Sequence, residues 1–207
     1  MKEIKSWSEL PVGKLEEIRA VTKTINDEDT ANITIAGILV DKTYKQMLEL
    51  PLNEVKRLIS NTAFLYEEPK KKKVSSVYLL NGTRYNILKK AEKMTTAQYI
   101  DYQGIARESY ERISEFLSIF FVPEGCKYND GNYDRDKVVS DISEYLSAEE
   151  ALGIAGFFTQ RCVRLLRRTL LLLEAKMKML SWRKETREQA KAVEKLIKEI
   201  RSTYGLI

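Results

Sequence analysis

The sequence of 207 residues contains no histidine. This absence excludes the Ser-His-Asp and Cys-His arrangements, the HExxH zinc motif and the side chain that most often acts as a general base near neutral pH. Chemistry based on lysine, glutamate, tyrosine or cysteine stays open, but no motif for such a reaction occurs in the chain. We therefore expect a protein that is not an enzyme and that has no catalytic residue, cofactor or metal ion.

Cysteine is nearly absent too, with only Cys126 and Cys162 in the chain. The two lie far apart and outside any CxxC pair, so the sequence predicts neither a zinc site nor a disulfide framework. We interpret both as reduced thiols of a cytoplasmic protein, packed as small apolar side chains.

Long apolar runs are missing as well. The first 18 residues contain lysines but no apolar core, so they do not resemble a secretory signal, and we expect the protein to stay in the cytoplasm. The most leucine-rich stretch, residues 161–180, is interrupted by seven charged residues, and its longest uninterrupted apolar run covers residues 170–173. A spanning helix needs roughly 20 apolar residues. We predict no membrane-spanning segment.

The composition is that of a folded globular protein, with 43% hydrophobic and 31% charged residues. The formal charge of +5 is unevenly distributed. Residues 161–207 hold thirteen basic and five acidic residues, an excess of eight positive charges, so the first 160 residues carry a net charge of −3. A basic C-terminal face of this kind could bind an acidic protein surface, nucleic acid or anionic lipid.

The periodicity predicts a mainly α-helical protein with one β-hairpin. Residues 74–88 form two β-type runs around Asn81-Gly82, a strong hairpin signal because both turn positions need positive φ. The register that this turn sets places Tyr78 opposite Tyr85. Because an isolated hairpin is only marginally stable, we expect it to pack on helices or to pair with another strand.

Helices are expected in most of the remaining chain. Pro51 stands at the entrance of one of them, and Ser147 with Glu150 forms a capping box before another. The predicted helices cover residues 6–21, 51–65, 95–105, 109–121, 148–180 and 183–203, with a buried segment at 32–40. We divide the chain into a helical domain with the inserted hairpin, residues 1–146, and a C-terminal helical hairpin or extension, residues 147–207, packed on the first part.

Residues 161–180 have a clear pattern when they are read with helical period. Six leucine and methionine residues share a broad apolar face, and three arginines at i, i+3 and i+7 form a basic ridge on another face. A solvated helix face would also explain the ridge. We favour a protein interface, because the apolar face is broader than one small core needs. The candidate partner-binding residues are Arg161, Arg164, Arg168, Leu166, Leu170 and Leu173.

Four consecutive lysines precede the hairpin: Lys70, Lys71, Lys72 and Lys73. Clustered lysines release counterions when they bind nucleic acid, so the four are candidate phosphate contacts. A solvated loop that protects the edge of the hairpin explains the tract equally simply, and we favour this interpretation.

The loop DGNYDRD, residues 130–136, resembles the start of a calcium-binding EF-hand loop. Asp130, Asn132 and Asp134 alternate as oxygen ligands for calcium do. However, Arg135 replaces the glycine of the sharp turn, and Asp141 stands where a bidentate glutamate belongs. We therefore predict a polar turn that caps the following helix.

The order of segments also resembles a known group of proteins. The succession SWSELPVGKLEEI, LELPLNEVKRLISNTAFL, VYLLNGTRYNIL, MTTAQYIDYQGI, FLSIFFVPEGCKY and AEEALGIAGFFTQ is similar to that of small virion-morphogenesis proteins of tailed bacteriophages. It is most similar to tail-assembly-chaperone-like proteins and to neck or ring proteins of podovirus-like phages that infect Bacteroidales. The resemblance covers about residues 5–165 and contains no invariant motif.

The resemblance implies a non-enzymatic function in the host cytoplasm during assembly, or in the virion itself. Such a protein holds other virion or assembly proteins, or forms one layer of a multi-copy structure, which includes homo-oligomers. The alternative is a basic accessory protein that binds nucleic acid through residues 70–73 and the C-terminal arginines. In the favoured interpretation, the apolar face of residues 161–180 docks on a partner protein and the arginine ridge sets the orientation.

Overall fold

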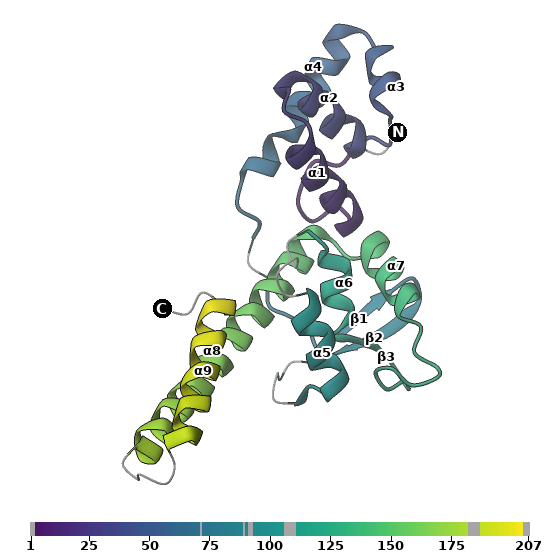
Figure 1. Ribbon diagram of the computed structural model, residues 1–207. Coiled ribbons are helices and arrows are strands. Elements are labelled where there is room, and N and C mark those ends of the chain that lie inside the picture. The colour runs from purple at the N-terminus through teal and green to yellow at the C-terminus, as the bar shows by residue number, and fades with distance from the viewer. Residues whose placement is uncertain are drawn as a thin grey trace. The chain divides into compact units, whose positions relative to one another are not determined.

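The computed structural model in Figure 1 describes residues 3–70, 72–88, 90, 93–105, 111–181 and 187–204. From residue 148 onwards, it describes the side chains of residues 148–161, 170–175, 191–198 and 201. The fold is mainly α-helical with one small antiparallel sheet, as the sequence predicts. The chain forms two compact units, Met1–Gly156 and Phe157–Ile207, and each is described by itself below.

The first unit begins with a group of helices: α1 (Val12–Thr24), α2 (Glu28–Leu39), α3 (Tyr44–Leu48), α4 (Leu52–Ser60) and the 3-10 helix η1 (Asn61–Tyr66). The helix predicted at residues 6–21 starts only after Pro11. The segment predicted as buried, residues 32–40, lies mostly in α2, which begins after Asp27; the carboxylate of Asp27 accepts a hydrogen bond from the amide of Thr30 at 2.8 Å. Pro51 precedes α4, as expected.

The Glu3 carboxylate, near the start of the chain, forms an ion pair with a residue of α4. Glu3 pairs with the guanidinium of Arg57 at 2.8 Å and with the ammonium of Lys5 at 3.2 Å. The hydrogen bond from Arg57, supported by Lys5, lowers the pKa of Glu3 from 4.5 to about 2. The carboxylate therefore remains charged in moderately acidic solution.

This lowered pKa predicts a pH dependence of stability. A carboxylate with a depressed folded-state pKa contributes stability above its ordinary pKa and loses that contribution as the pH falls toward the folded value. We expect Glu3→Gln to lower the melting temperature at neutral pH, with a difference from the parent protein that shrinks between pH 4.5 and about 2. Thermal melts followed by circular dichroism across this range would measure the difference. A difference that stays constant with pH would contradict the assignment.

Helix α2 ends in a left-handed turn. The amide of Lys42 donates to the carbonyl of Gly37 at 2.9 Å, and Asp41 between them has a φ of 56°. This is the Schellman arrangement, which satisfies the last carbonyls of a helix. Lys14 of α1 forms an ion pair with the Asp41 carboxylate at 2.7 Å. The turn directs the chain into α3, whose Met47 is fully buried next to α2.

This turn makes Gly37 sensitive to substitution. A Cβ atom at position 37 would lie 2.6 Å from the carbonyl oxygen of Lys42 and 3.1 Å from Cγ of Met47. We expect Gly37→Ala to destabilise the protein by about 1–3 kcal/mol through overpacking. Gly104→Ala is the matched control, because nothing lies within 4 Å of the added atom, and helix propensity predicts a gain of about 0.5–1 kcal/mol there. Urea denaturation would show both values, and equal effects of the two changes would contradict the prediction.

The sheet contains β1 (Val77–Leu80), β2 (Thr83–Ile87) and β3 (Phe121–Pro123), in that order. The hairpin prediction is confirmed: Tyr78 pairs with Tyr85, and the turn residues Asn81 and Gly82 have φ values of 47° and 73°. The hairpin also pairs with another strand, as expected, because β3 binds the second edge of β2 in antiparallel orientation.

The helix predicted at residues 109–121 is wrong at its end, over residues 119–121. Helix α6 covers only Ile113–Ser118, and Phe121 begins β3. The apolar run that suggests a longer helix instead supplies an edge strand, because β2 offers unpaired backbone groups that the chain can satisfy. The amide of Leu88 donates to the carbonyl of Phe120 at 3.1 Å and extends this pairing. The preceding helix, α5 (Thr96–Ile105), agrees with its prediction.

The last three helices are α7 (Arg135–Tyr145), α8 (Ala148–Ser181) and α9 (Arg187–Tyr204). Helix α8 agrees with the prediction of one helix from 148 to 180. Its first turn differs in one detail from a capping box: the amide of Glu150 donates to Ser147 Oγ at 3.3 Å, and this hydroxyl donates to the Glu150 carboxylate at 3.1 Å. Within the described ranges, no helix is both long and apolar enough to cross a lipid bilayer.

Two distant segments of the first unit meet where α1 and α8 begin. The amide of Val12 donates to the carbonyl of Leu146 at 3.1 Å, and the amide of Ala148 donates to the carbonyl of Leu10 at 2.6 Å. These bonds form an isolated antiparallel bridge between Pro11 and Ser147. The start of the unit and the end of its last loop are therefore joined through their backbones.

Candidate interaction surface

The second unit contains the predicted partner-binding residues of α8. The guanidinium of Arg161 lies 4.4 Å from the ring centre of Phe157, a cation–π contact. Leu170 is buried, with 6% of its surface exposed, and Leu173 is half-buried. Arg164, Leu166 and Arg168 belong to α8, but their side chains lie outside the described residues.

Two neighbouring leucines of α8 are far more exposed than Leu170 and Leu173. Leu171 is 66% exposed and Leu172 is 72% exposed. Helix α9 lies beside α8 (Figure 1), and Arg201 of α9 donates to the Glu174 carboxylate at 2.7 Å. The sequence signal was the run of four leucines at 170–173, which cannot all lie on one face of a helix. The helical period places Leu170 and Leu173 on the predicted apolar face and leaves Leu171 and Leu172 outside it.

The exposed leucine pair shares its helix face with the arginine positions. Residues three, four or seven positions apart lie on one face of an α-helix. Arg168 precedes Leu171 by three positions and Leu172 by four, and Arg161 precedes Arg168 by seven. Leu170 lies on another face of α8 and is buried. We use the term leucine–arginine face for Arg161, Arg164, Arg168, Leu171 and Leu172.

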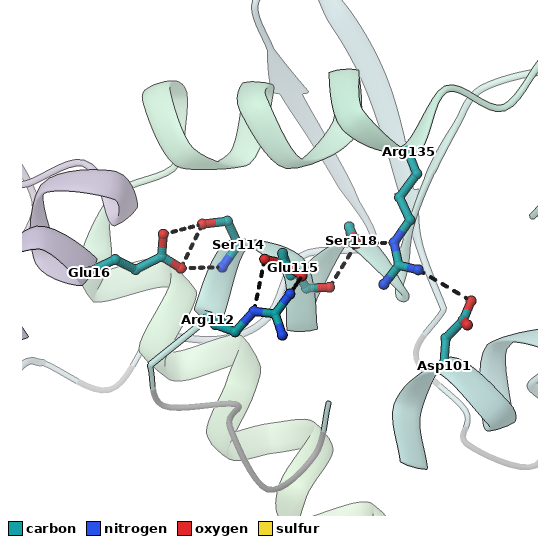
Figure 2. A network of polar contacts seen from close by, with 7 residues as sticks. All are labelled: Glu16, Asp101, Arg112, Ser114, Glu115, Ser118 and Arg135. Atoms are coloured by element: carbon teal, nitrogen blue, oxygen red, sulfur yellow. Dashed lines mark hydrogen bonds and ion pairs between the residues drawn. The ribbon is translucent and has the colours of Figure 1, made fainter. Parts of the chain in front are cut away.

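The polar groups of the first unit form a network that joins its helices (Figure 2). Glu16 of α1 accepts hydrogen bonds from the amide and the hydroxyl of Ser114, both at 2.7 Å, near the start of α6. Arg112 forms an ion pair with the Glu115 carboxylate in the first turn of the same helix. The Glu16 carboxylate thus satisfies one of the amide groups that the helix itself leaves free.

The same network fastens the start of α7. Arg135 lies 3.6 Å from the carboxylate of Asp101 in α5, and its Nε donates to Ser118 Oγ at 3.4 Å. The hydroxyl of Tyr128 donates to Asp101 at 2.5 Å, and that of Tyr133 donates to the carbonyl of Ser118 at 2.9 Å. Burial raises the pKa of Tyr133 to about 12. These tyrosines act as hydrogen-bond donors that hold the loop before α7.

The calcium-like loop is a polar turn, as predicted. Asp130 accepts from the amides of Lys127 at 2.8 Å and Asn132 at 3.0 Å, so its carboxylate is used inside the loop. Asp134 caps α7 by accepting from the amide of Lys137 at 3.0 Å. In the described part of the chain, no three His, Cys, Asp or Glu residues gather as metal ligands.

Asp141 has a different neighbourhood from the one that the calcium pattern suggests. Its carboxylate is buried in α7 and accepts from the hydroxyl of Tyr85 at 2.5 Å and from the side-chain Nδ2 of Asn81 at 3.1 Å. Burial and this carboxylate raise the pKa of Tyr85, which keeps the proton that it donates. The hairpin turn is therefore attached to α7.

The described lysines of the tract, Lys70, Lys72 and Lys73, lie outside helices and strands, in agreement with the favoured loop interpretation. Lys70 and Lys73 are exposed. Lys72 lies 2.7 Å from the carboxylate of Glu149, whose side chain is only 7% exposed, so one lysine of the tract neutralises a buried acid. Lys71 lies outside the described residues.

Comparison of the chain with protein-family models, curated proteins and solved structures finds no match. The function must therefore be inferred from the molecule's own surfaces. The polar network and the Asp141 cluster stabilise the fold, since each of their charged groups described above has a protein partner. The leucine–arginine face is different, because its large apolar side chains are open to solvent.

A cavity of about 300 Å³ lies between α1, α2 and η1. Its floor is apolar, with Leu15, Ile18 and Ile35 buried, and Trp7 lies at one wall. The indole nitrogen of Trp7 donates to the carbonyl of Glu67 at 3.0 Å, and its ring meets Phe64 edge to face. The Trp7 contacts connect the N-terminal segment to η1.

Proposed function

We propose that the protein acts without catalysis, by protein–protein contact, in the assembly of the tail or neck of a tailed bacteriophage. It does so either as an assembly chaperone or as one component of a ring. The observation that supports this proposal is the leucine–arginine face of α8. Two adjacent leucines have 66% and 72% of their surface exposed to water, which is unfavourable. Binding of a partner that covers them would stabilise the complex by the hydrophobic free energy of that buried surface.

The charge of the second unit supports a specific kind of partner. Residues 157–207 carry thirteen basic and five acidic residues, and residues 1–156 carry a net charge of −3. An acidic protein surface would therefore be attracted to the second unit before contact, and the arginines would set its orientation on the leucine pair. A further copy of this chain is one such partner to test, because its residues 1–156 carry a net charge of −3, and an acidic virion protein is another.

The first experiment measures the absolute mass of the purified protein by light scattering after size exclusion, for the parent and for Leu171→Ser/Leu172→Ser. A closed multimer that the double substitution breaks into smaller species would support a ring component. A monomer would direct the test to a chaperone, with co-expressed virion proteins as the binding partners. The same substitutions should then abolish co-purification.

The matched control is Leu48→Ser/Leu52→Ser, which alters two leucines that are 58% and 66% exposed on α3 and α4. It removes a similar, slightly smaller amount of exposed apolar surface from the first unit and should leave association unchanged. Arg161→Glu should weaken association. If the α8 pair and the control pair have the same effect on association, the leucine–arginine face is not the docking surface.

A further inference from the structure

The cavity between α1, α2 and η1 has a mostly apolar lining and opens to solvent. Leu15, Ile18 and Ile35 are buried at its floor, and Trp7 lies at one wall. Tyr66 also lines the cavity and has 83% of its surface exposed, so the cavity is accessible on this side. Apolar side chains of another molecule can therefore enter it, and their removal from water favours binding.

The volume of the cavity suits a pair of aliphatic side chains. It measures about 300 Å³. This value is at the lower limit for ligand pockets, which range from roughly 300 to 1,000 Å³. Two leucine side chains need roughly 240 Å³ if each carbon atom takes the volume of one water molecule, ~30 Å³. The cavity therefore has room for two leucine side chains.

Exposed carboxylates lie on the η1 side of the cavity. Glu67 and Glu68 follow the lining residue Tyr66 directly in the chain, and both are exposed. The indole nitrogen of Trp7 donates to the carbonyl of Glu67 at 3.0 Å, so the backbone of this segment is fixed beside two lining residues. Neither carboxylate forms an ion pair with a described residue. Both are therefore open to basic side chains of a partner.

The α2 side of the cavity is acidic as well. Glu28 and Asp29 precede the lining residue Asn32 by four and three positions, which places both next to it on the helix surface. Both are exposed, and within the described ranges neither forms an ion pair. Two basic residues oppose the acids: Arg19, which lines the cavity, and the exposed Lys70. We use the term acidic rim for four residues: Glu28, Asp29, Glu67 and Glu68.

The leucine–arginine face of α8 has the opposite charge and a matching apolar pair. It presents Leu171 and Leu172 to solvent, in a unit whose residues 157–207 carry an excess of eight positive charges. Two copies of this face would repel each other, because contact between like charges costs free energy. An apolar cavity with an acidic rim attracts the face instead, and every copy of the chain contains both surfaces. The charge pattern therefore favours a second copy as the occupant of the cavity.

We infer that the cavity of one copy receives Leu171 and Leu172 of another copy, with the arginines of α8 next to the acidic rim. This inference rests on the proposed function and names the surface on which the leucine–arginine face docks. Because the two surfaces in contact differ, the contact is heterologous. A row of copies joined in this way either closes into a ring or grows into a filament.

The test is a mixing experiment with the full chain, followed by sedimentation velocity over a range of concentrations. One variant, L171S/L172S, lacks the leucine pair but keeps the cavity. The other, T22W, fills the cavity from an exposed lining position of α1 and keeps the leucine pair. Each variant alone should associate roughly tenfold more weakly than the parent, or worse. An equimolar mixture should form a one-to-one complex, because one intact contact remains between the two variants.

Two further variants support the test. T96W is the matched control for T22W, since Thr96 is an exposed threonine of α5 and is not among the lining residues. It should associate as the parent does. E67K/E68K alters only exposed side chains and so tests the acidic rim without a change in the core. It should weaken association roughly tenfold or more at low salt and less at high salt, because salt screens exposed charges.

Three results would overturn the inference. A parent protein that stays monomeric at every concentration excludes a second copy as the occupant. Normal association of T22W and E67K/E68K, with loss in L171S/L172S, would mean that the leucine pair docks on another surface, and the proposed function would stand. A mixture that stays dissociated would indicate that both copies use the same face. Normal association of L171S/L172S would instead contradict the proposed function, and this inference with it.

Discussion

Replacing Phe116 by alanine is expected to lower the free energy of unfolding by about 3–5 kcal/mol. Only 1% of the Phe116 surface is exposed. Its ring centre lies 5.4 Å from that of Phe120 and 6.0 Å from that of Tyr102. The substitution removes a large buried ring and leaves a cavity between α5 and α6 that these two neighbours cannot fill. Urea denaturation followed by circular dichroism would measure the loss.

The control for this experiment is Tyr66→Ala. Tyr66 is 83% exposed, so removal of its ring should change the free energy of unfolding by no more than about 0.5 kcal/mol. A loss below about 1 kcal/mol for Phe116→Ala would mean that the ring does not pack as described. The core around α6 would then need another anchor.

Replacing Asp141 by alanine should cost about 3 kcal/mol or more, because hydrogen bonds to a charged group contribute about 1.5–3 kcal/mol each and two are lost. The change leaves the hydroxyl of Tyr85 buried without its acceptor and frees the side chain of Asn81. Tyr85→Phe should also destabilise the protein, because a buried carboxylate then keeps only one donor. In the double variant the combined loss should be smaller than the sum of the two single losses.

Asp136→Ala is the comparison for Asp141→Ala, since Asp136 is an exposed carboxylate in the same helix. Its loss should cost at most about 1 kcal/mol, from its favourable position in the first turn. The hydrogen exchange rates of the β1–β2 backbone amides separate this explanation from a general loss of stability. They should rise more in Asp141→Ala than in Phe116→Ala at conditions of equal stability, because Asp141 holds the hairpin turn.

The features that the sequence predicts well are those with local causes. The Asn81-Gly82 turn sets its own register, so the pairing of Tyr78 with Tyr85 follows from a few neighbouring residues. The cap at Asp134 and the long helix α8 are local in the same sense. Strand β3 is not local, because Phe121 gains its backbone partners from Ile87, and nothing in its own segment indicates that this edge is open.

The candidate sites show the same limit. The carboxylate of Asp141 stabilises the fold by accepting a hydrogen bond from Tyr85. Tyr85 lies 56 residues earlier in the chain, and only the fold brings the two together. The run of leucines in α8 predicts an apolar helix, but the choice of Leu171 and Leu172 as the exposed pair depends on what the other faces of α8 contact.

The backbone bridge between Pro11 and Ser147 has a consequence for the order of events during translation. The carbonyl of Leu10 has the amide of Ala148 as its hydrogen-bond donor. The first unit therefore cannot complete its fold until nearly all of it has left the ribosome. Residues 157–207, which carry the leucine–arginine face, emerge from the ribosome after that point. An N-terminal part that folds as soon as it emerges would then be complete before the adhesive surface appears. Synthesis order itself would delay association until each copy has folded.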